Sequence, residues 1–165
     1  MGIDPGLANT GFGVVRVVGG RMSAVDGGVI EAPAEDAPER RLATIHAELA
    51  KLIDWHEPEA VGLEDLYFGK NARSAIAVGE ARGVAMLAAA ARGVPCFDYT
   101  PQAVKLAVCG SGAADKRQVQ RMVGALLSLP SPPDSDHTAD ALAVAICHAS
   151  NTRPEHAGRI EVGVG

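Results

Sequence analysis

Apolar residues at the start of the chain fall into short runs that are separated by turn residues. The run up to Asp4 and the runs 10–18 and 21–32 have the apolar and β-branched character of strands. Gly19-Gly20 between the second and third runs is typical of a two-residue hairpin turn, and Gly27-Gly28 indicates a bulge or bend. The pattern predicts three consecutive antiparallel strands.

From residue 39 onward the apolar spacing becomes that of helices. In 39–56 the apolar residues lie on one helical face, and Pro58 ends the segment. A short apolar strand follows at 60–66, and then an alanine- and glycine-rich helix at 71–92, with Asn71 as its N-cap. The remaining predicted elements are a strand at 96–99, a helix at 101–108 capped by Thr100, a helix to 127 opened by Asp115, and a last helix opened by Asp134 or Ser135.

The order of these elements predicts an α/β fold. Alternation of strands and helices in the middle of the chain requires right-handed parallel crossovers. Joined to the antiparallel start, they give a mixed five-stranded sheet of order 3-2-1-4-5 with helices on both faces. The 165 residues suit one domain, which we place at 1–150. Residues 151–165 show little apolar periodicity, so we expect a flexible C-terminal tail.

Composition excludes several classes of protein. Hydrophobic residues make up 47% of the chain and charged residues 21%, which is an ordinary globular balance. The longest run of apolar residues and glycine, 83–91, is too short to cross a bilayer. The three cysteines are scattered and form no C-x-x-C pair, which argues against a disulfide framework or a zinc site. We therefore expect a cytoplasmic protein with no membrane partner.

The formal net charge of −5 hides an uneven distribution. Between residues 70 and 121 there are eight Lys or Arg against three acids. Such segregation permits a basic face for nucleic acid on an acidic protein. A set of ordinary solvated helix faces explains the same count.

Carboxylates recur at the ends of apolar elements. Asp4 ends the first strand, and Glu64 lies in the fourth strand, its neighbour in the predicted order. The segment D-S-D-H-T-A-D places either His137 and Asp140 or Asp136 and Asp140 on one face of the last helix. Carboxylates converging from three segments repel one another unless a divalent cation neutralises them, so the pattern predicts a metal site. Alternatively, Asp136 only stabilises the helix N-terminus and His137 lies at the surface.

Six motifs together resemble the RuvC Holliday-junction resolvases over residues 2–150. They are GIDPG, TGFG, LEDLYFGKNARSA, GEARGVA, ADKRQVQRMV and HTADALAVAICH. The resemblance implies a ribonuclease-H-like fold and a homodimeric, metal-dependent endonuclease that cuts four-way DNA junctions by paired symmetric nicks during recombination and repair. It also implies the RuvA–RuvB branch-migration complex as a partner.

The same resemblance places the catalytic metal ligands at Asp4, Glu64, His137 and Asp140, with Asp136 as a lower-ranked ligand. It implies Mg²⁺. Cleavage of a phosphodiester needs an activated water, charge stabilisation and help for the departing oxygen, which two cations can supply, so we expect two ions per subunit. Many relatives have aspartate where this chain has His137, and imidazole suits Mn²⁺ better than Mg²⁺. Mn²⁺ is therefore an alternative, and His137 either binds metal or orients and deprotonates water.

The resemblance also indicates the DNA-binding residues. Lys105 and Lys116 match basic positions near the DNA backbone, and Lys70 and Arg73 are candidates for the same surface. Tyr67 matches an aromatic position near unpaired bases at the junction. Without the resemblance, Tyr67 is as well explained as a core residue. The small residues of the helix at 71–92 pack against the sheet or form the dimer interface.

Three other functions fit parts of the pattern. The start resembles the first phosphate loop of actin-like kinases, but those proteins need a longer chain. A ribonuclease-H-like RNA-processing nuclease of the YqgF type shares the early acid, and a non-catalytic junction-binding module needs no ligand set. Only three residues precede Asp4, fewer than in relatives, so we expect a short first strand; a start codon further upstream is the alternative.

Overall fold

A computed structural model describes residues 1–65 and 72–152, with the backbone alone for 72–74. Its five strands form one sheet of order β3-β2-β1-β4-β5, which confirms the predicted order. β1 pairs antiparallel with β2 and parallel with β4, so the sheet is mixed. The elements in chain order are β1 (Gly2–Asp4), β2 (Asn9–Val18), β3 (Arg21–Glu31), α1 (Pro38–His56), β4 (Val61–Glu64), α2 (Ala72–Ala90), β5 (Cys96–Tyr99), α3 (Pro101–Cys109), α4 (Lys116–Leu126) and α5 (Asp136–Asn151).

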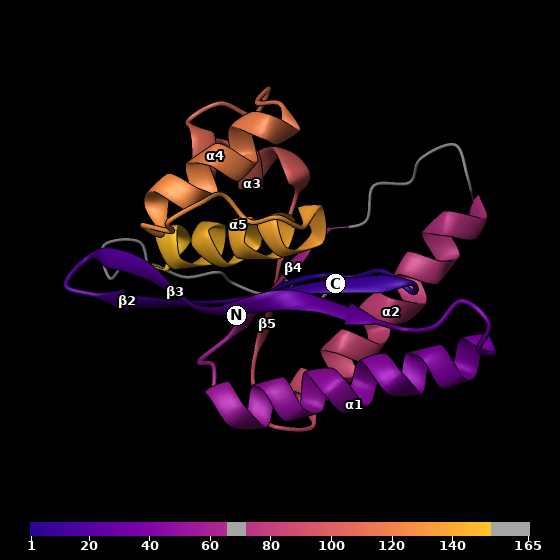
Figure 1. Ribbon diagram of the computed structural model, residues 1–165. Coiled ribbons are helices and arrows are strands. Elements are labelled where there is room, and N and C mark those ends of the chain that lie inside the picture. The colour runs from indigo at the N-terminus through magenta and orange to yellow at the C-terminus, as the bar shows by residue number, and fades with distance from the viewer. Residues whose placement is uncertain (66–71, 153–165) are drawn as a thin grey trace, which may run out of the picture.

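Helices cover both faces of the sheet (Figure 1). α5 packs against all five strands on one face, and α3 and α4 pack on α5 as an outer layer. α1 and α2 pack together on the opposite face. Two hydrophobic cores result. One joins the sheet to α1 and α2 around Ile3, Leu49 and Leu63, and the other joins α3 and α4 to α5 around Val123 and Ile146.

Glycines in the central strands let α5 approach the sheet closely. A Cβ atom at Gly11 would collide with the backbone of His137, and one at Gly2 would collide with the backbone of Ala141. At Gly13 it would lie 2.7 Å from the Leu142 side chain. Any side chain at these positions would move α5 outward. The glycines therefore fix the distance between α5 and the ends of the central strands.

The predicted bulge at Gly27-Gly28 is wrong. Gly27 and Gly28 pair regularly with Gly13 and Phe12, and the register shift lies at Val25, between the Val14–Asp26 and Val15–Ala24 pairs. The two glycines instead make room for side chains. A Cβ atom at Gly28 would lie 3.0 Å from the Phe12 ring, and one at Gly27 would lie 3.2 Å from Thr138 on α5.

The predicted turns and caps agree with the structure where it describes them. Gly19 and Gly20 both have positive φ, as a hairpin turn of this kind requires. The Thr100 hydroxyl accepts a hydrogen bond from the N–H of Ala103, and Asp115 forms a capping box with Gln118. Ser135 is the N-cap residue of α5. Asn71 and the predicted tail from 153 onward lie outside the described residues.

Candidate functional site

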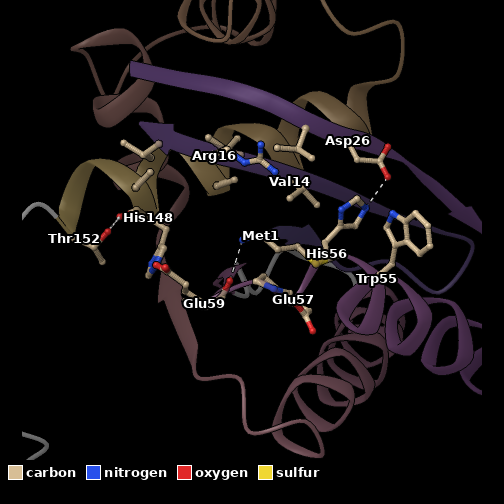
Figure 2. Close-up of a pocket in the computed structure, with 17 residues that line it drawn as sticks. Met1, Val14, Arg16, Asp26, Trp55, His56, Glu57, Glu59, His148 and Thr152 are labelled. Atoms are coloured by element: carbon tan, nitrogen blue, oxygen red, sulfur yellow. Dashed lines mark hydrogen bonds and ion pairs between the residues drawn. The ribbon is translucent and has the colours of Figure 1, made fainter. Parts of the chain in front are cut away.

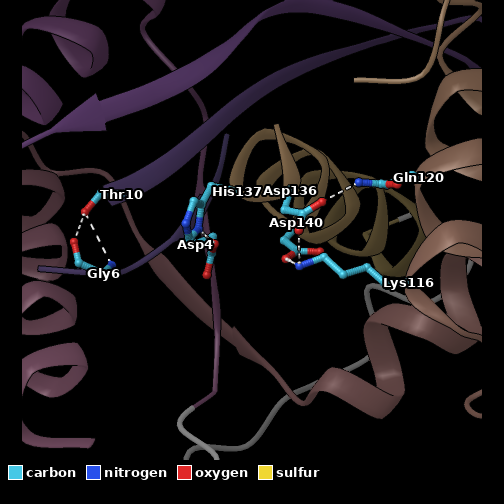
Figure 3. Close-up of polar contacts among 8 residues, drawn as sticks. All are labelled: Asp4, Gly6, Thr10, Lys116, Gln120, Asp136, His137 and Asp140. Carbon is cyan, nitrogen blue, oxygen red and sulfur yellow. Dashed lines mark hydrogen bonds and ion pairs between the residues drawn. The ribbon is translucent and has the colours of Figure 1, made fainter. Parts of the chain in front are cut away.

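Asp4 and Glu64 end two neighbouring central strands. β1 and β4 are parallel, and their register pairs Ile3 with Leu63, so the next residues in each strand are Asp4 and Glu64. After Asp4 the chain turns sharply, and the buried Thr10 holds the turn. Its hydroxyl donates to the Gly6 carbonyl at 2.7 Å (Figure 3). Both carboxylates thus stand at the same edge of the sheet on rigid strand ends.

The first turn of α5 brings His137 against Asp4. His137 Nδ1 lies 2.8 Å from Asp4 Oδ2, and Figure 3 shows the two side chains pointing toward each other. A carboxylate only accepts hydrogen bonds, so Nδ1 carries the proton in this contact. In the neutral imidazole Nε2 then keeps its lone pair, free to accept a proton or to bind a cation.

Lys116 links the two aspartates of α5. Its ammonium lies 3.0 Å from Asp136 Oδ2 and 3.5 Å from Asp140 Oδ2 (Figure 3). Gln120 Nε2 donates to the other oxygen of Asp136 at 2.6 Å. Burial lowers the pKa of Lys116, but its contacts with the two aspartates outweigh that effect and hold the pKa above its usual value. Both oxygens of Asp136 are therefore engaged by neighbours.

Glu64 and Asp140 share a cavity with the two basic candidates. The cavity has a volume of about 210 Å³ and is lined by Glu64, Pro101, Lys105, Lys116, Val119 and Asp140. Burial, together with the charges of Asp4 and Asp140, raises the pKa of Glu64 to about 7, although Lys105 and Lys116 oppose the shift. Burial also raises the pKa of Asp140, and Asp4 adds to this effect. Together with the adjacent Asp4 and Asp136, four carboxyl groups stand against two lysines at this edge of the sheet.

Such a charge imbalance suits a hard cation, but the side chains are not yet arranged as one ligand set. Among residues 1–65 and 75–152, no three His, Cys, Asp or Glu side chains are grouped so that they could hold a metal ion. The candidates instead meet in pairs: Asp4 with His137, and Asp140 with Lys116. The candidates still lie along one edge of the sheet, because Asp4 and Glu64 end neighbouring strands, His137 contacts Asp4, and Asp140 lines the same cavity as Glu64.

Some sequence-based candidates lie elsewhere or outside the described residues. Tyr67 and Lys70 are not described, nor is the side chain of Arg73. Two contacts were missed by sequence reasoning. Gln120 holds Asp136, and Arg82 donates from α2 to the carbonyl oxygen of Glu64 at 3.2 Å. The available signal was that both residues belong to quoted motifs, Arg82 to GEARGVA and Gln120 to ADKRQVQRMV.

A larger cavity lies apart from these residues. It has a volume of about 760 Å³ and forms where β2 runs on beyond β1, between β2, the end of α1 and the end of α5 (Figure 2). His56 Nε2 lies 2.8 Å from Asp26 Oδ2 at its wall, and Trp55 stands exposed at the rim. None of the sequence-based site residues lines it.

No helix in the described part of the chain is long and apolar enough to cross a membrane.

Comparison with known proteins yields one consistent family. The model of the family "Crossover junction endodeoxyribonuclease RuvC" matches residues 1–148. The RuvC of Moorella thermoacetica is 53% identical over 150 residues, which cover 91% of this chain and 90% of the relative. That of Pelotomaculum thermopropionicum is 50% identical over 149 residues, or 90% of this chain and 91% of the relative.

Solved structures agree with the sequence relatives. Thermus thermophilus RuvC in complex with Holliday junction substrate is 37% identical, with a TM-score of 0.89 over 94% of each chain. The yeast mitochondrial Holliday junction resolvase Ydc2 is 13% identical with a TM-score of 0.63, which shows a shared fold alone. The mixed sheet is therefore of the ribonuclease-H-like kind expected from the sequence. By the family model and by identity near one half over nine tenths of its length, the chain belongs to the RuvC crossover junction endodeoxyribonucleases.

Proposed function

We propose that this chain resolves four-way DNA junctions by hydrolysing one phosphodiester bond in each of two strands of like polarity, in recombination and repair. The observation that carries the proposal is its identity of about one half to RuvC enzymes across nine tenths of both chains. The convergence of Asp4, Glu64, His137 and Asp140 at one sheet edge supports the same chemistry.

The donor set fits a hard divalent cation. Three carboxylates and one imidazole lie along this edge, and burial and mutual repulsion raise the pKa of both Glu64 and Asp140. We propose that Asp4, Glu64, Asp140 and His137 hold Mg²⁺ or Mn²⁺, two ions per subunit. When bound, such ions lower the pKa of a water and stabilise charge on the phosphate that is cleaved. Asp136 stays a lower-ranked ligand, because Lys116 and Gln120 each contact one of its oxygens.

The protein's own groups prepare the site for this reaction. Asp4 holds the His137 ring so that Nε2 keeps a lone pair, which either binds a cation or, as the alternative role, orients a water and takes its proton. Lys105 and Lys116 line the cavity and offer positive charge to the DNA phosphates. Lys116 leaves its contacts with Asp136 and Asp140 when it does so. By the family resemblance we add Tyr67, Lys70 and Arg73 to the DNA-binding surface.

Two active sites are needed for paired nicks, and a twofold dimer provides them. α2 presents an exposed face with Ile76, Gly83 and Leu87 at helical spacing, and a Cβ atom at Gly83 would meet nothing within 4 Å. We propose that this face joins two copies of the chain. The RuvA–RuvB complex as a partner and a cytoplasmic location are proposals from the resemblance and the cysteine pattern.

A synthetic four-way junction tests the proposal. With Mg²⁺ or Mn²⁺ we expect paired symmetric nicks, and without metal we expect binding alone. Asp4→Asn should bind the junction but cut it at least 100-fold more slowly, because it removes one of the carboxylates that would hold the cations. Asp26→Asn is a matched control, since Asp26 pairs with His56 at the same distance of 2.8 Å as Asp4 pairs with His137.

The outcomes separate the alternatives. Equal cutting of plain duplex DNA would indicate another nuclease, and preferred cutting of structured RNA would indicate a YqgF-type activity. Junction binding without cutting under any metal would indicate a binding module. Wild-type rates in Asp4→Asn would show that the metal site is wrongly assigned.

A further inference from the structure

The carbonyl group of Glu64 lacks a partner from the strand beside it. In the parallel ladder between β1 and β4, the Gly62 N–H donates to the Met1 carbonyl at 2.8 Å, and the pairs continue to Ile3 and Leu63. Hydrogen bonds in such a ladder recur every second residue. The donor for the Glu64 carbonyl would then be the N–H of residue 5. That residue is Pro5, which has no N–H.

Arg82 supplies the missing donor from the opposite face of the sheet. Its Nη1 donates to the Glu64 carbonyl oxygen at 3.2 Å, and its Nη2 lies 2.6 Å from Asp98 Oδ1 on β5. The Arg82 side chain is only 11% exposed, whereas that of Asp98 is 53% exposed. The buried arginine thus joins α2 to the ends of β4 and β5.

The peptide group after Glu64 is consequently held at both of its polar atoms. Its carbonyl oxygen accepts from Arg82, and its N–H, which belongs to Asp65, donates to the Tyr99 carbonyl at 2.8 Å. This peptide group follows the Cα atom that carries the Glu64 side chain. Its orientation therefore sets the direction in which the carboxylate leaves the strand end.

We propose that Arg82 is a positioning residue for Glu64: it replaces the strand hydrogen bond that Pro5 cannot make and so holds the Glu64 carboxylate toward the cations. The inference rests on the proposed function, in which Glu64 is a metal ligand. A guanidinium suits this task because its fixed fork bonds a carbonyl and a carboxylate at once. A lysine ammonium at this position would have to choose between them or bond both less well.

Arg82→Met tests the proposal, with Arg92→Met and Asp98→Asn as controls. Like Arg82, Arg92 contacts an exposed aspartate and a backbone carbonyl: its Nε lies 2.6 Å from Asp54, and it donates to the Ala88 carbonyl. It differs in lying just beyond α2 and away from Glu64. Asp98→Asn removes the ion pair and leaves the Glu64 contact. For each protein we would measure thermal melting, junction binding without metal, Mn²⁺ affinity by calorimetry without DNA, and single-turnover cleavage.

We expect Arg82→Met to lose about 10–100-fold in Mn²⁺ affinity and in cleavage rate, the usual effect of removing a group that orients a metal ligand. Junction binding should stay within about 2-fold, because no DNA contact is lost. Arg82→Lys should recover part of both losses. Both controls should keep wild-type Mn²⁺ affinity and cleavage rate.

Three results would overturn the inference. One is wild-type Mn²⁺ affinity in a folded Arg82→Met. Another, if Arg82→Met does not fold, is an Arg82→Lys protein that folds and has wild-type affinity and rate. A third is an equal loss in Arg92→Met, which would mean that the effect is general destabilisation. Glu64→Gln separates these results from failure of the proposed metal site: if Glu64→Gln cuts at the wild-type rate, Glu64 is not a ligand and the site assignment fails. Failure of the proposed function would instead appear as a wild-type protein that cuts no four-way junction.

Discussion

At the scale of single residues, Glu64 shows the cost of building this site. The carboxyl group ends a strand of the central sheet, close to Asp4 and Asp140, and its pKa is raised to about 7 by burial and by those charges. A folded protein that must ionise such a group near neutral pH loses stability by doing so. A divalent cation that binds the ionised carboxylate restores this stability, so the unfavourable ionisation favours cation binding.

We therefore predict that Glu64→Gln stabilises the protein at pH 8 while abolishing cleavage. The shift from 4.5 to about 7 corresponds to roughly 3 kcal/mol, which partial contact with water reduces to about 1–2 kcal/mol. The pKa of Glu64 is higher in the folded state than in the unfolded state, so protonated Glu64 favours folding. This stabilisation is complete below about pH 4.5 and is lost as the pH rises through 7. The advantage of the variant should appear over that interval and vanish near pH 4.5 in metal-free urea unfolding.

The matched control is Glu31→Gln, at an exposed strand end, which should show no such pH-dependent gain. Added Mn²⁺ should raise the stability of wild type more than that of Glu64→Gln. Equal stability of the two proteins at pH 8 and pH 4.5 would contradict the prediction.

At the scale of elements, the seating of α5 on glycines decides where His137 and Asp140 lie. Gly2 and Gly11 are on the central strands, and a side chain on either would meet the backbone of α5. The same helix carries two of the four proposed ligands. The distance between α5 and the sheet therefore determines where these two proposed ligands lie relative to Asp4 and Glu64.

Gly11→Ala should test this link. Its methyl group would lie 2.6 Å from the carbonyl carbon of His137, so α5 must shift away from Asp4. We expect a loss of about 1–3 kcal/mol in unfolding free energy, as for an overpacked core, and a loss of cleavage larger than the unfolded fraction explains. Urea unfolding and single-turnover cleavage on the same samples measure both.

Gly83→Ala is the stability control for this variant, because a Cβ atom there would meet nothing within 4 Å. Alanine at an exposed helical position should be neutral or stabilising by up to about 1 kcal/mol. If Gly11→Ala keeps wild-type stability and cleavage, the sheet accommodates the methyl group and the link between packing and site geometry is wrong.

The sequence predicted these elements well where local rules act. The apolar alternation and the Gly19-Gly20 turn defined the antiparallel start, and the caps at Thr100 and Asp115 marked two helices. Relations between elements were harder to predict. The sequence predicts a bulge or bend at Gly27-Gly28, because a glycine in a strand has the same local pattern whether it bends the strand or makes room for neighbouring side chains.

The candidate site shows the same division. The strand order predicts that Asp4 and Glu64 lie side by side, and the structure places them at neighbouring strand ends. The contact of Arg82 with the Glu64 carbonyl was not predicted, since it depends on a backbone acceptor that Pro5 leaves free. Side-chain contacts to backbone atoms carry little sequence signal, because any residue can supply the acceptor.

At the scale of the whole molecule, the layers separate two tasks. α5, with α3 and α4 outside it, forms the side that carries His137, Asp140 and the cavity lysines, whereas α1 and α2 cover the other face (Figure 1). The exposed apolar face of α2 is thus free for a second copy of the chain. Arg82 spans from this helix to the end of β4, so a dimer formed through α2 would support the Glu64 strand as well.

We predict that Leu87→Glu separates the proposed dimer. Leu87 is 59% exposed on α2, and a glutamate there would place two like charges in an apolar interface. Sedimentation should show dimers for wild type and monomers for the variant, and paired nicks on a four-way junction should give way to single, uncoupled nicks. Leu106→Glu is the matched control, because Leu106 on α3 is 57% exposed and lies outside the α2 face. The proposal that α2 forms the interface would be wrong if Leu87→Glu remained a dimer, or if only Leu106→Glu became a monomer.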